Sequence, residues 1–383
     1  MRKRYLMTPG PTPVPAEVLL SMAEPIIHHR TPEFSSILMR AIEDLKYVFQ
    51  TEGDVFVFAC SGTGVMESAV VNCFSSGDKV IVARNGKFGD RNYQLASTYG
   101  LEVIDLKYEW TSVIKPGDIA AALRNNPDAK GVFVTQSETS SGVLNDVKTV
   151  GQIVRDYPNA ILIVDSITGI GAVECKTDEW GLDVVMTGSQ KGLMLPPGLA
   201  AVSVSEKAWG HVEKSRLPKF YFDWTKAKKS LGKETTPFTP PVSLIIGLGK
   251  ALSLIREEGL ENVIRRHSVL AEAMRAGVVA MGLELFAPPE GRGNAVTPVW
   301  VPEGIDGGKI PKIMSDKCGV TIAGGQDEYK GRIFRLGHLG YFDRFDIITT
   351  LSALEMTLNE LGYPVELGIG VAAAQAVFEN NPF

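Results

Sequence analysis

Short apolar segments rich in valine, isoleucine and leucine recur along the first two thirds of this chain, and most are separated by segments long enough for a helix. Near-continuous apolar strands that alternate with helices are typical of a mostly parallel sheet covered by helices on both faces. The last two segments are joined by a loop, so one of them is expected to run antiparallel. The sequence therefore predicts an α/β fold around a seven-stranded sheet. The expected strands are DVFVFA from Asp54, DKVIVA from Asp78, LEVIDL from Leu101, GVFVTQ from Gly131, AILIVDS from Ala160, DVVMTG from Asp183 and LAAVSVS from Leu199.

The rest of the chain has a different pattern. The stretch from Arg216 to Pro241 is aromatic, basic and rich in proline and threonine, which predicts an irregular connection that wraps a surface or a partner. Helices are expected from Pro241 to Glu258 and from Leu260 to Met281. The strands AVTPVWV and GRIFRLG, with a last long helix from Arg344, then predict a smaller α/β region. The predicted division is an N-terminal arm (1–15), a large domain (16–250) and a small C-terminal domain (251–383).

Composition argues against several classes of protein. The 39 Lys and Arg residues are balanced by 44 Asp and Glu, without a long run of one sign, which argues against a nucleic-acid partner. No segment approaches the roughly 18 uninterrupted apolar residues of a spanning helix, and no apolar stretch follows the basic N-terminal residues as in a secretory signal. The cysteines are scattered and form no CxxC pair, which favours a reducing, cytoplasmic location. They are Cys60, Cys73, Cys175 and Cys318.

Polar residues follow the expected strands where parallel strands deliver their carboxyl ends to one edge of a sheet. The first strand leads into CSGTG and a helix, which predicts either a phosphate site at a helix N-terminus or an ordinary helix cap. AILIVDS ends at Asp165, an acid that is costly to bury without a cation or a strong donor. DVVMTG is followed by Ser189, Gln190 and Lys191, and GVFVTQ by Glu138, Thr139 and Ser140.

A phosphate cradle, a buried acid and a lysine at one edge match what pyridoxal phosphate requires. Its aldehyde needs an amine, its pyridine nitrogen needs a carboxylate, and its phosphate needs helix-end donors. Burial and neighbouring cations favour the neutral, nucleophilic form of such a lysine. No metal constellation competes, because the five histidines form no HExxH and no His/Cys cluster has ligand spacing.

The ordered set of motifs resembles the class V aminotransferases, a family of fold-type I pyridoxal phosphate enzymes. Within that family, the chain is most similar to the alanine–glyoxylate and serine–pyruvate (serine–glyoxylate) aminotransferases. The resemblance covers essentially the whole chain and implies a homodimer with its active site at the subunit interface. The motifs that carry it are TPGPTPVP, HHRTPEF, YVFQTEG, SGTG, NGKFG, SETSSGV, VDSITGIG, GSQKGLMLPPG, TPPVSL and FRLGHLG.

The resemblance also implies roles for individual residues. Lys191 would be the Schiff-base lysine that moves the substrate Cα proton, and Asp165 would hold the pyridinium nitrogen. Arg335 would grip the substrate carboxylate, and Gly10 would line the substrate pocket. The implied cofactor contacts are Thr63, Gly64, the Val65 backbone and Gln190 at the phosphate, Phe88 stacked on the ring, Thr139 beside it, and, from the other subunit, Thr239 together with Thr236, which replaces a tyrosine of animal members.

These roles predict a transaminase that moves an amino group from alanine or serine to a 2-oxo acid such as glyoxylate or pyruvate. An aspartate donor is the alternative, and it would require a second cation, for which Arg30 and Arg332 are candidates. A cysteine desulfurase would need a mobile nucleophilic cysteine, and Cys318 reads instead as a buried residue at a strand start. A cofactor-free binding protein would have lost the lysine or the acid. Three simpler interpretations stay open: core packing for Phe88, turn positions for Thr139 and Thr236, and a loop anchor for the His28-His29-Arg30 segment.

Overall fold

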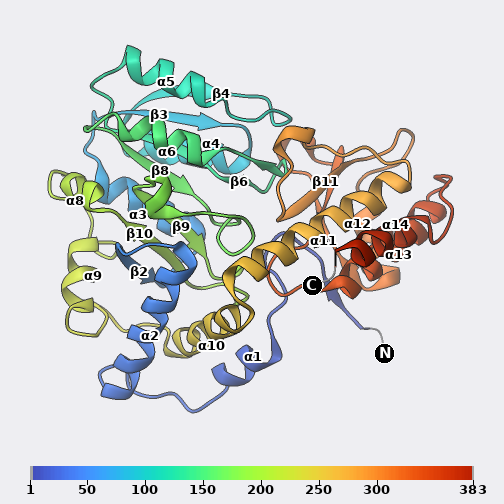
Figure 1. Ribbon diagram of the computed structural model, residues 1–383, viewed down its shortest axis with the longest axis horizontal. Helices are drawn as coiled ribbons and strands as arrows, with labels where there is room; N and C mark the ends of the chain where they lie inside the picture. The colour runs from blue at the N-terminus through green and yellow to red at the C-terminus, as the bar shows by residue number, and fades with distance from the viewer. Residues whose placement is uncertain (1–2, 382–383) are drawn as a thin grey trace.

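The computed structural model describes residues 3–381, and a seven-stranded sheet forms the centre of its first two thirds (Figure 1). The strand order is β2-β10-β9-β8-β5-β3-β4. Only β10 runs antiparallel to its neighbours in this sheet, so the predicted α/β fold and its single reversed strand are confirmed. The strands are β2 (Asp54–Phe58), β3 (Lys79–Arg84), β4 (Glu102–Lys107), β5 (Gly131–Thr135), β8 (Ile161–Asp165), β9 (Val184–Gly188) and β10 (Ala200–Val204).

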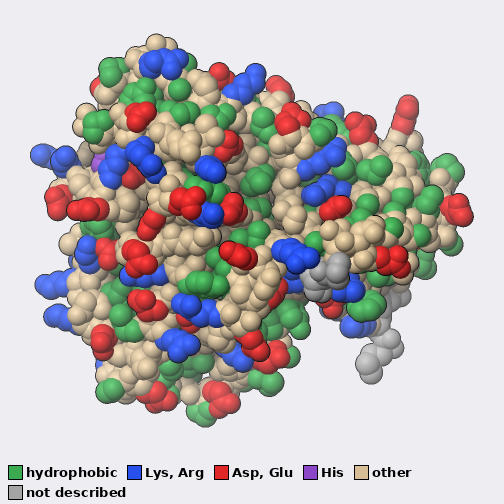
Figure 2. Space-filling view, in the orientation of Figure 1, with side chains coloured by type: hydrophobic (Ala, Val, Ile, Leu, Met, Phe, Trp, Pro, Cys, Tyr) green, Lys and Arg blue, Asp and Glu red, His purple; other side chains and the backbone are tan. Residues whose placement is uncertain are grey.

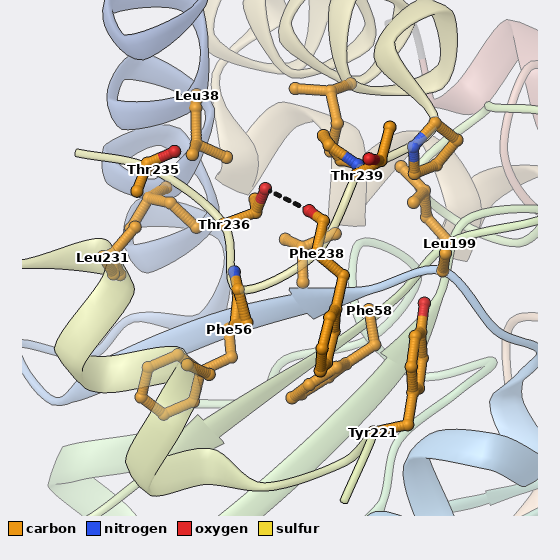
Figure 3. A pocket seen from close by; sticks show the side chains of 18 residues that line it. Leu38, Phe56, Phe58, Leu199, Tyr221, Leu231, Thr235, Thr236, Phe238 and Thr239 are labelled. Carbon is orange, nitrogen blue, oxygen red and sulfur yellow. Dashed lines mark hydrogen bonds between the residues drawn. The ribbon is translucent and has the colours of Figure 1, made fainter. Parts of the chain in front are cut away.

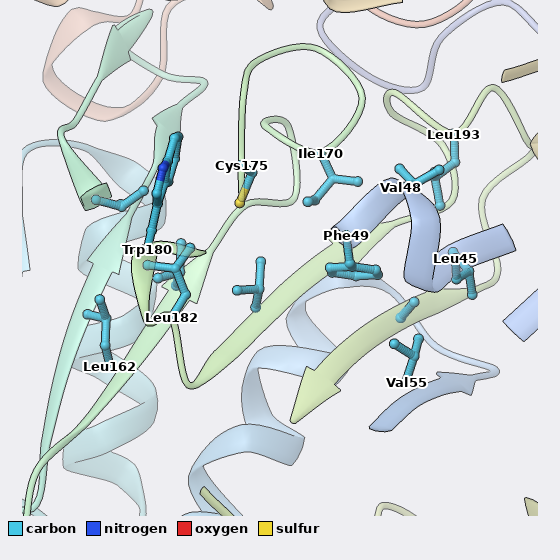
Figure 4. Packing of buried hydrophobic residues seen from close by; sticks show 14 of the residues in the cluster. Leu45, Val48, Phe49, Val55, Leu162, Ile170, Cys175, Trp180, Leu182 and Leu193 are labelled. Carbon is cyan, nitrogen blue, oxygen red and sulfur yellow. The ribbon is translucent and has the colours of Figure 1, made fainter. Parts of the chain in front are cut away.

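Helices cover both faces of the sheet because alternate strand residues point to opposite sides. On β5, for example, Val132 and Val134 belong to one apolar cluster and Phe133 to the other. Figure 4 shows part of the first cluster, in which Phe49 and Leu45 of α2 pack beside Val55 of β2. The helices of the first face are α2 (Pro32–Phe49), α5 (Pro116–Asn125), α6 (Val147–Arg155) and α10 (Val242–Glu258). Those of the second are α3 (Gly62–Cys73), α4 (Lys87–Thr98), α8 (Glu206–Val212) and α9 (Trp224–Leu231).

The last third of the chain has its own apolar cluster, beside the sheet region in Figure 1. Its three-stranded antiparallel sheet has the order β11-β14-β13. The N-terminal strand β1 (Tyr5–Leu6) pairs with β12 (Val320–Thr321), so the N-terminal arm lies against this region. The domain limits given above stay a prediction. The other elements here are β11 (Val296–Trp300), β13 (Ala323–Gly324), β14 (Ile333–Gly337), α11 (Leu260–Ala280), α12 (Lys309–Ile313), α13 (Arg344–Glu360) and α14 (Ile369–Asn380).

The structure differs from the sequence-based expectations at three places. Helix α9 interrupts the stretch expected to be irregular, and the Asp223 carboxylate caps it by accepting from Thr225 N and Lys226 N. Helix α14 follows α13, which was expected to be last; its apolar and small residues give little helical periodicity to read. Cys318 is half-buried at the end of a π-helical turn (Met314–Cys318), because Gly319 in the left-handed conformation separates it from β12.

The helices within residues 3–381 and the face drawn in Figure 2 show neither a membrane-spanning helix nor a one-sign patch of charge. No helix within residues 3–381 is long and apolar enough to cross a membrane. On the face seen in Figure 2, basic and acidic side chains are interspersed. Other short elements are α1 (Ala16–Met22), α7 (Thr177–Trp180), β6 (Ser137–Glu138) and β7 (Val143–Leu144).

Candidate active site

Lys191 lies just beyond the carboxyl end of β9, where the N-terminal arm covers it. Its side chain is buried, and Nζ donates a hydrogen bond of 2.7 Å to the Pro9 carbonyl. The next residue of the arm is Gly10, with φ +137°, and a Cβ built there would lie 2.1 Å from Lys191 Nζ. Thr12 Oγ1 also donates to the Lys191 carbonyl, at 3.2 Å. Gly10 is therefore the residue that leaves room for the lysine, as a pocket-lining role requires.

The surroundings of Lys191 favour its neutral amine. Burial lowers the pKa of Lys191 to about 8, and the positive charges of Arg335 and Arg91 act in the same direction while Asp165 opposes them. A lysine with this pKa is a substantially better nucleophile near neutral pH than an exposed one. Lys191 is thus a buried amine suited to react with a carbonyl group.

Asp165 ends β8, the strand adjacent to β9, and its carboxylate is only half satisfied. Oδ1 accepts from Ile167 N at 3.0 Å, whereas Oδ2 is buried and has no hydrogen-bond partner within residues 3–381. Burial raises the pKa of Asp165 to about 7, and Glu138 adds to this, while Ile167 N, Arg91 and Lys191 act in the opposite direction. An orphaned, buried carboxylate oxygen is costly unless a ligand supplies a donor. The protonated nitrogen of a pyridine ring is such a donor.

The residues expected to form a phosphate cradle lie at the N-terminus of α3, apart from Gln190, which precedes Lys191. Ser61 precedes the helix but makes no side-chain cap within the described chain, so the ordinary-cap interpretation of CSGTG finds no support. Thr63 Oγ1 accepts a 3.1 Å bond from Arg91, and Gln190 Oε1 is buried without a partner among residues 3–381. A Cβ on Gly64 would lie 2.7 Å from that of Cys60. The N–H groups of Gly64 and Val65 donate to the Ser61 carbonyl, so donors for a phosphate must come from elsewhere at this helix start.

The next site residues come from three segments that meet at one place. Phe88 is the second residue of α4 and is half-buried, with the Arg91 guanidinium 4.9 Å from its ring centroid. Thr139 is buried, and its hydroxyl lies 3.0 Å from that of Thr168. The Thr139 carbonyl accepts a 3.1 Å bond from Arg335. The contact links the site edge of the large sheet to β14 of the last third.

Arg335 is a buried guanidinium that forms no ion pair within the described residues. Nε donates to the Gly324 carbonyl at 2.9 Å, and Nη1 also lies 3.3 Å from Gln326 Oε1. Burial lowers the pKa of Arg335 to about 10, although Glu138 raises it. A buried cation bonded only to neutral acceptors is suited to bind an anionic ligand such as a carboxylate.

Thr236 and Thr239 lie in a different part of the molecule. Both line an apolar hollow over β2, where Thr236 Oγ1 donates to the Phe238 carbonyl at 2.7 Å (Figure 3). The residues lining this hollow do not include Lys191, Asp165 or Arg335. Arg30 is exposed and donates to the Thr236 carbonyl at 2.7 Å, so the His28-His29-Arg30 loop lies against the same segment. The structure of one chain therefore does not bring Thr236 and Thr239 together with the other site residues.

Sequence analysis missed Arg91 entirely. It follows Phe88 by one helical turn, contacts Thr63, and its charge reaches both Asp165 and Lys191. An i, i+3 pair at the start of a helix that follows a sheet strand was the available signal. No group of three or more His, Cys, Asp or Glu residues within 3–381 could hold a metal ion.

A lysine of lowered pKa, a carboxylate on the adjacent strand with one unpartnered oxygen, and an arginine without a carboxylate partner among residues 3–381 lie around a mostly parallel sheet, as in a fold-type I pyridoxal phosphate enzyme. Comparison with known proteins agrees with this site. The profile of the Aminotransferase class-V family matches residues 4–330. The chain belongs to the class V aminotransferases and is a pyridoxal phosphate-dependent aminotransferase, as its motifs predicted.

Three relatives and one solved structure illustrate the similarity. A soluble hydrogenase small subunit of a Synechococcus species is 46% identical over 98% of each chain. The serine–glyoxylate aminotransferase of Methylorubrum extorquens is 39% identical over 99% of this chain and 97% of its own. The L-aspartate–glyoxylate aminotransferase of Paracoccus denitrificans is 39% identical over 97% and 95%. The crystal structure of ureidoglycine–glyoxylate aminotransferase from Bacillus subtilis has a TM-score of 0.95 at 30% identity and covers 99% of both chains.

Proposed function

We propose that this aminotransferase moves the amino group of serine or alanine to glyoxylate or a similar small 2-oxo acid. The observation that carries the proposal is Arg335, a buried guanidinium without a carboxylate partner in the described chain, which suits the α-carboxylate that every amino acid and 2-oxo acid shares. The serine–glyoxylate relative supports the same donor and acceptor.

The residues divide the work by position. When bound, pyridoxal phosphate supplies an aldehyde that exchanges amino groups and a ring that accepts electrons. Lys191 would hold the aldehyde and, once free, carry the proton to and from the substrate Cα. Asp165 would keep the ring nitrogen protonated, since a carboxylate in an apolar site strongly favours a bound proton beside it. Arg335 would orient the substrate, and the burial of all three side chains excludes water.

An aspartate donor is a second candidate, and the position of Arg30 favours it. A second carboxylate needs a second cation, and Arg30 lies on the Thr236 segment, which by resemblance reaches the other subunit's site. Arg332 is a weaker candidate because its guanidinium lies against the rings of Trp300 and Tyr329, 5.6 and 5.2 Å from their centroids.

A half-reaction screen tests both donors. Serine, alanine, glycine and aspartate are each added to cofactor-loaded protein, and conversion of the cofactor to its amine form is followed by absorbance. We expect serine or alanine to convert it at the lowest concentration, and Arg335→Gln to raise that concentration at least about tenfold because a charged hydrogen bond is lost. Conversion by aspartate alone would replace the small-donor proposal. Conversion by none of the four would contradict it.

We infer that the chain works as a homodimer. Phe220 and Tyr221 are 72% and 42% exposed, and the rings of both lie near that of Phe238. Tyr221 and Phe238 line the apolar hollow (Figure 3). Exposed apolar clusters of this kind mark association surfaces. Thr239 is exposed beside them, which suits a contact made across the interface.

Phe220→Asp should convert the dimer to a monomer and weaken cofactor binding. A buried charge at an interface is strongly unfavourable, and a monomer would lack Thr239 of its partner. Light scattering should give twice the 41.5 kDa chain mass for the natural protein and one chain mass for the variant. Phe345→Asp is the matched control, since Phe345 is 67% exposed on the last third, and it should stay dimeric. A light-scattering mass of one chain for the natural protein would refute the inference.

A further inference from the structure

Glu138 is a completely buried carboxylate that no part of the proposed reaction uses. It ends the short strand β6 and has no exposed surface. Oε2 accepts hydrogen bonds of 3.0 Å from both Phe88 N and Gly89 N, and Oε1 accepts from Ser140 N and Ser140 Oγ at 3.0 and 2.6 Å. All four groups are donors, so the ionised carboxylate satisfies them and a protonated one would not.

These bonds cap helix α4 with a residue from a distant part of the chain. The helix starts after Gly86, which has no side chain to cap it. Its first three N–H groups are instead taken by Glu138 and by Ser140 Oγ, which accepts from Lys87 N at 3.0 Å. The negative charge also lies at the positive end of the helix dipole. A Cβ on Gly86 would lie 2.4 Å from the Glu138 side chain, so glycine is required for this close approach.

The capped helix start is the part of α4 that faces the site. Phe88 lies in its first turn, and Arg91, one turn on, contacts Thr63 at the phosphate end. On the other side, the residue after Glu138 offers its carbonyl to Arg335. One carboxylate therefore ties together the segments that carry the ring-stacking, phosphate and carboxylate contacts.

We propose that Glu138 is a positioning residue, which fixes the start of α4 so that Phe88 and Arg91 are held against the cofactor. This inference rests on the proposed function and on the cofactor contact that the family resemblance implies for Phe88. It assigns Glu138 no contact with substrate or cofactor. Its hold on Phe88 and Arg91 passes through the backbone of α4, and its charge also raises the pKa values of Asp165 and Arg335.

The test compares Glu138→Gln with a matched variant elsewhere. Glu355 is also buried and also accepts backbone N–H bonds at the start of a helix. Its donors are Gly368 N, just before α14, and Gly370 N, in the first turn of α14. Each glutamine replaces one acceptor oxygen by a donor, so both variants should lose thermal stability. Only Glu138→Gln should raise the dissociation constant for pyridoxal phosphate, by about tenfold or more, and reduce the circular dichroism of the bound cofactor.

Hydrogen exchange of the cofactor-free protein supplies an independent readout. In Glu138→Gln, the amides of the peptide around Phe88 and Gly89 should exchange faster than in the natural protein, and in Glu355→Gln they should not. Ser140→Ala, a milder change that leaves Lys87 N without its acceptor, should give the same effects at smaller size. If Glu138→Gln lowers stability as Glu355→Gln does but leaves cofactor affinity and dichroism unchanged, the inference is wrong. If the natural protein itself does not bind pyridoxal phosphate, the proposed function fails instead.

Discussion

Lys191→Ala will fold and bind the cofactor without covalent attachment, and transamination will fall by about 10²- to 10⁴-fold or more, the usual contribution of a positioned acid–base group. The loss is large because the same amine is proposed to hold the aldehyde and to carry the Cα proton. Treatment with borohydride followed by peptide mass spectrometry measures the covalent attachment of the cofactor to Lys191. The natural protein should retain cofactor mass on the peptide that contains Lys191, and the variant should not.

Lys207→Ala is the appropriate control for this change. Lys207 is also partly buried and burial also lowers its pKa, but it lies at the start of α8 beside Asp183. Its loss should leave activity and cofactor attachment unchanged. Removal of Lys191 costs the fold little, because one hydrogen bond to Pro9 is lost, worth about 1 kcal/mol. Covalent labelling that persisted in Lys191→Ala would assign the role to another lysine.

Asp165→Asn is expected to abolish most activity and yet stabilise the cofactor-free protein. The carboxylate is buried with Oδ2 unpartnered within residues 3–381, so an amide of the same shape removes an uncompensated buried charge. Transamination should fall by roughly three orders of magnitude, since the ring nitrogen would lose its charged partner. Above pH 7, where the carboxylate is ionised, the melting temperature of the cofactor-free protein should rise by at least about 2 °C.

The same carboxylate makes stability depend on pH. The pKa of Asp165 is about 7 in the folded protein and 3.8 ordinarily, so between these values the folded state binds more protons than the unfolded state. Stability therefore falls as the pH rises from about 4 to 7, by on the order of 4 kcal/mol from this group, and stays low above pH 7. Asp165→Asn should remove this decline.

Asp183→Asn provides the contrasting measurement. Asp183 is buried too, but both its oxygens are used, by Leu162 N and by Ser205 Oγ. Its amide variant should lower the melting temperature and leave the reaction unaffected. If Asp165→Asn destabilised the cofactor-free protein as much as Asp183→Asn does, the view of Asp165 as an uncompensated charge would be wrong.

The sequence was sufficient to predict the seven-stranded sheet and the proximity of Lys191 and Asp165 at its carboxyl edge. Lys191 and Asp165 follow adjacent parallel strands, and the ends of such strands meet at one edge, so their proximity follows from local pattern alone. Glu138 and the Phe88 amide are 50 residues apart, and their contact depends on how closely α4 approaches β6. The hydrophobic periodicity of the sequence does not predict how closely α4 and β6 approach each other.

The sequence was also insufficient to place Thr236 and Thr239 or to predict the weakly patterned helix α14. Thr236 and Thr239 were identified only by resemblance, and within one chain they line an apolar hollow away from Lys191. Helix α14 was not predicted because most of its residues are apolar or small. Its buried Ala374 and Phe378 therefore do not form a distinct apolar stripe in the sequence.

The N-terminal arm connects two parts of the molecule that meet at the site. Tyr5 and Leu6 are paired with β12, and the Met7 carbonyl accepts from Gly337 N, so the start of the arm belongs mechanically to the last third. Two residues after Met7, the Pro9 carbonyl accepts a hydrogen bond from the Lys191 amine, and Thr12 donates one to the Lys191 carbonyl. A displacement of the last third relative to the large sheet would therefore move Pro9 and Thr12 relative to Lys191. The surroundings of the Lys191 amine thus depend on how the apolar core of the last third is placed relative to the large sheet.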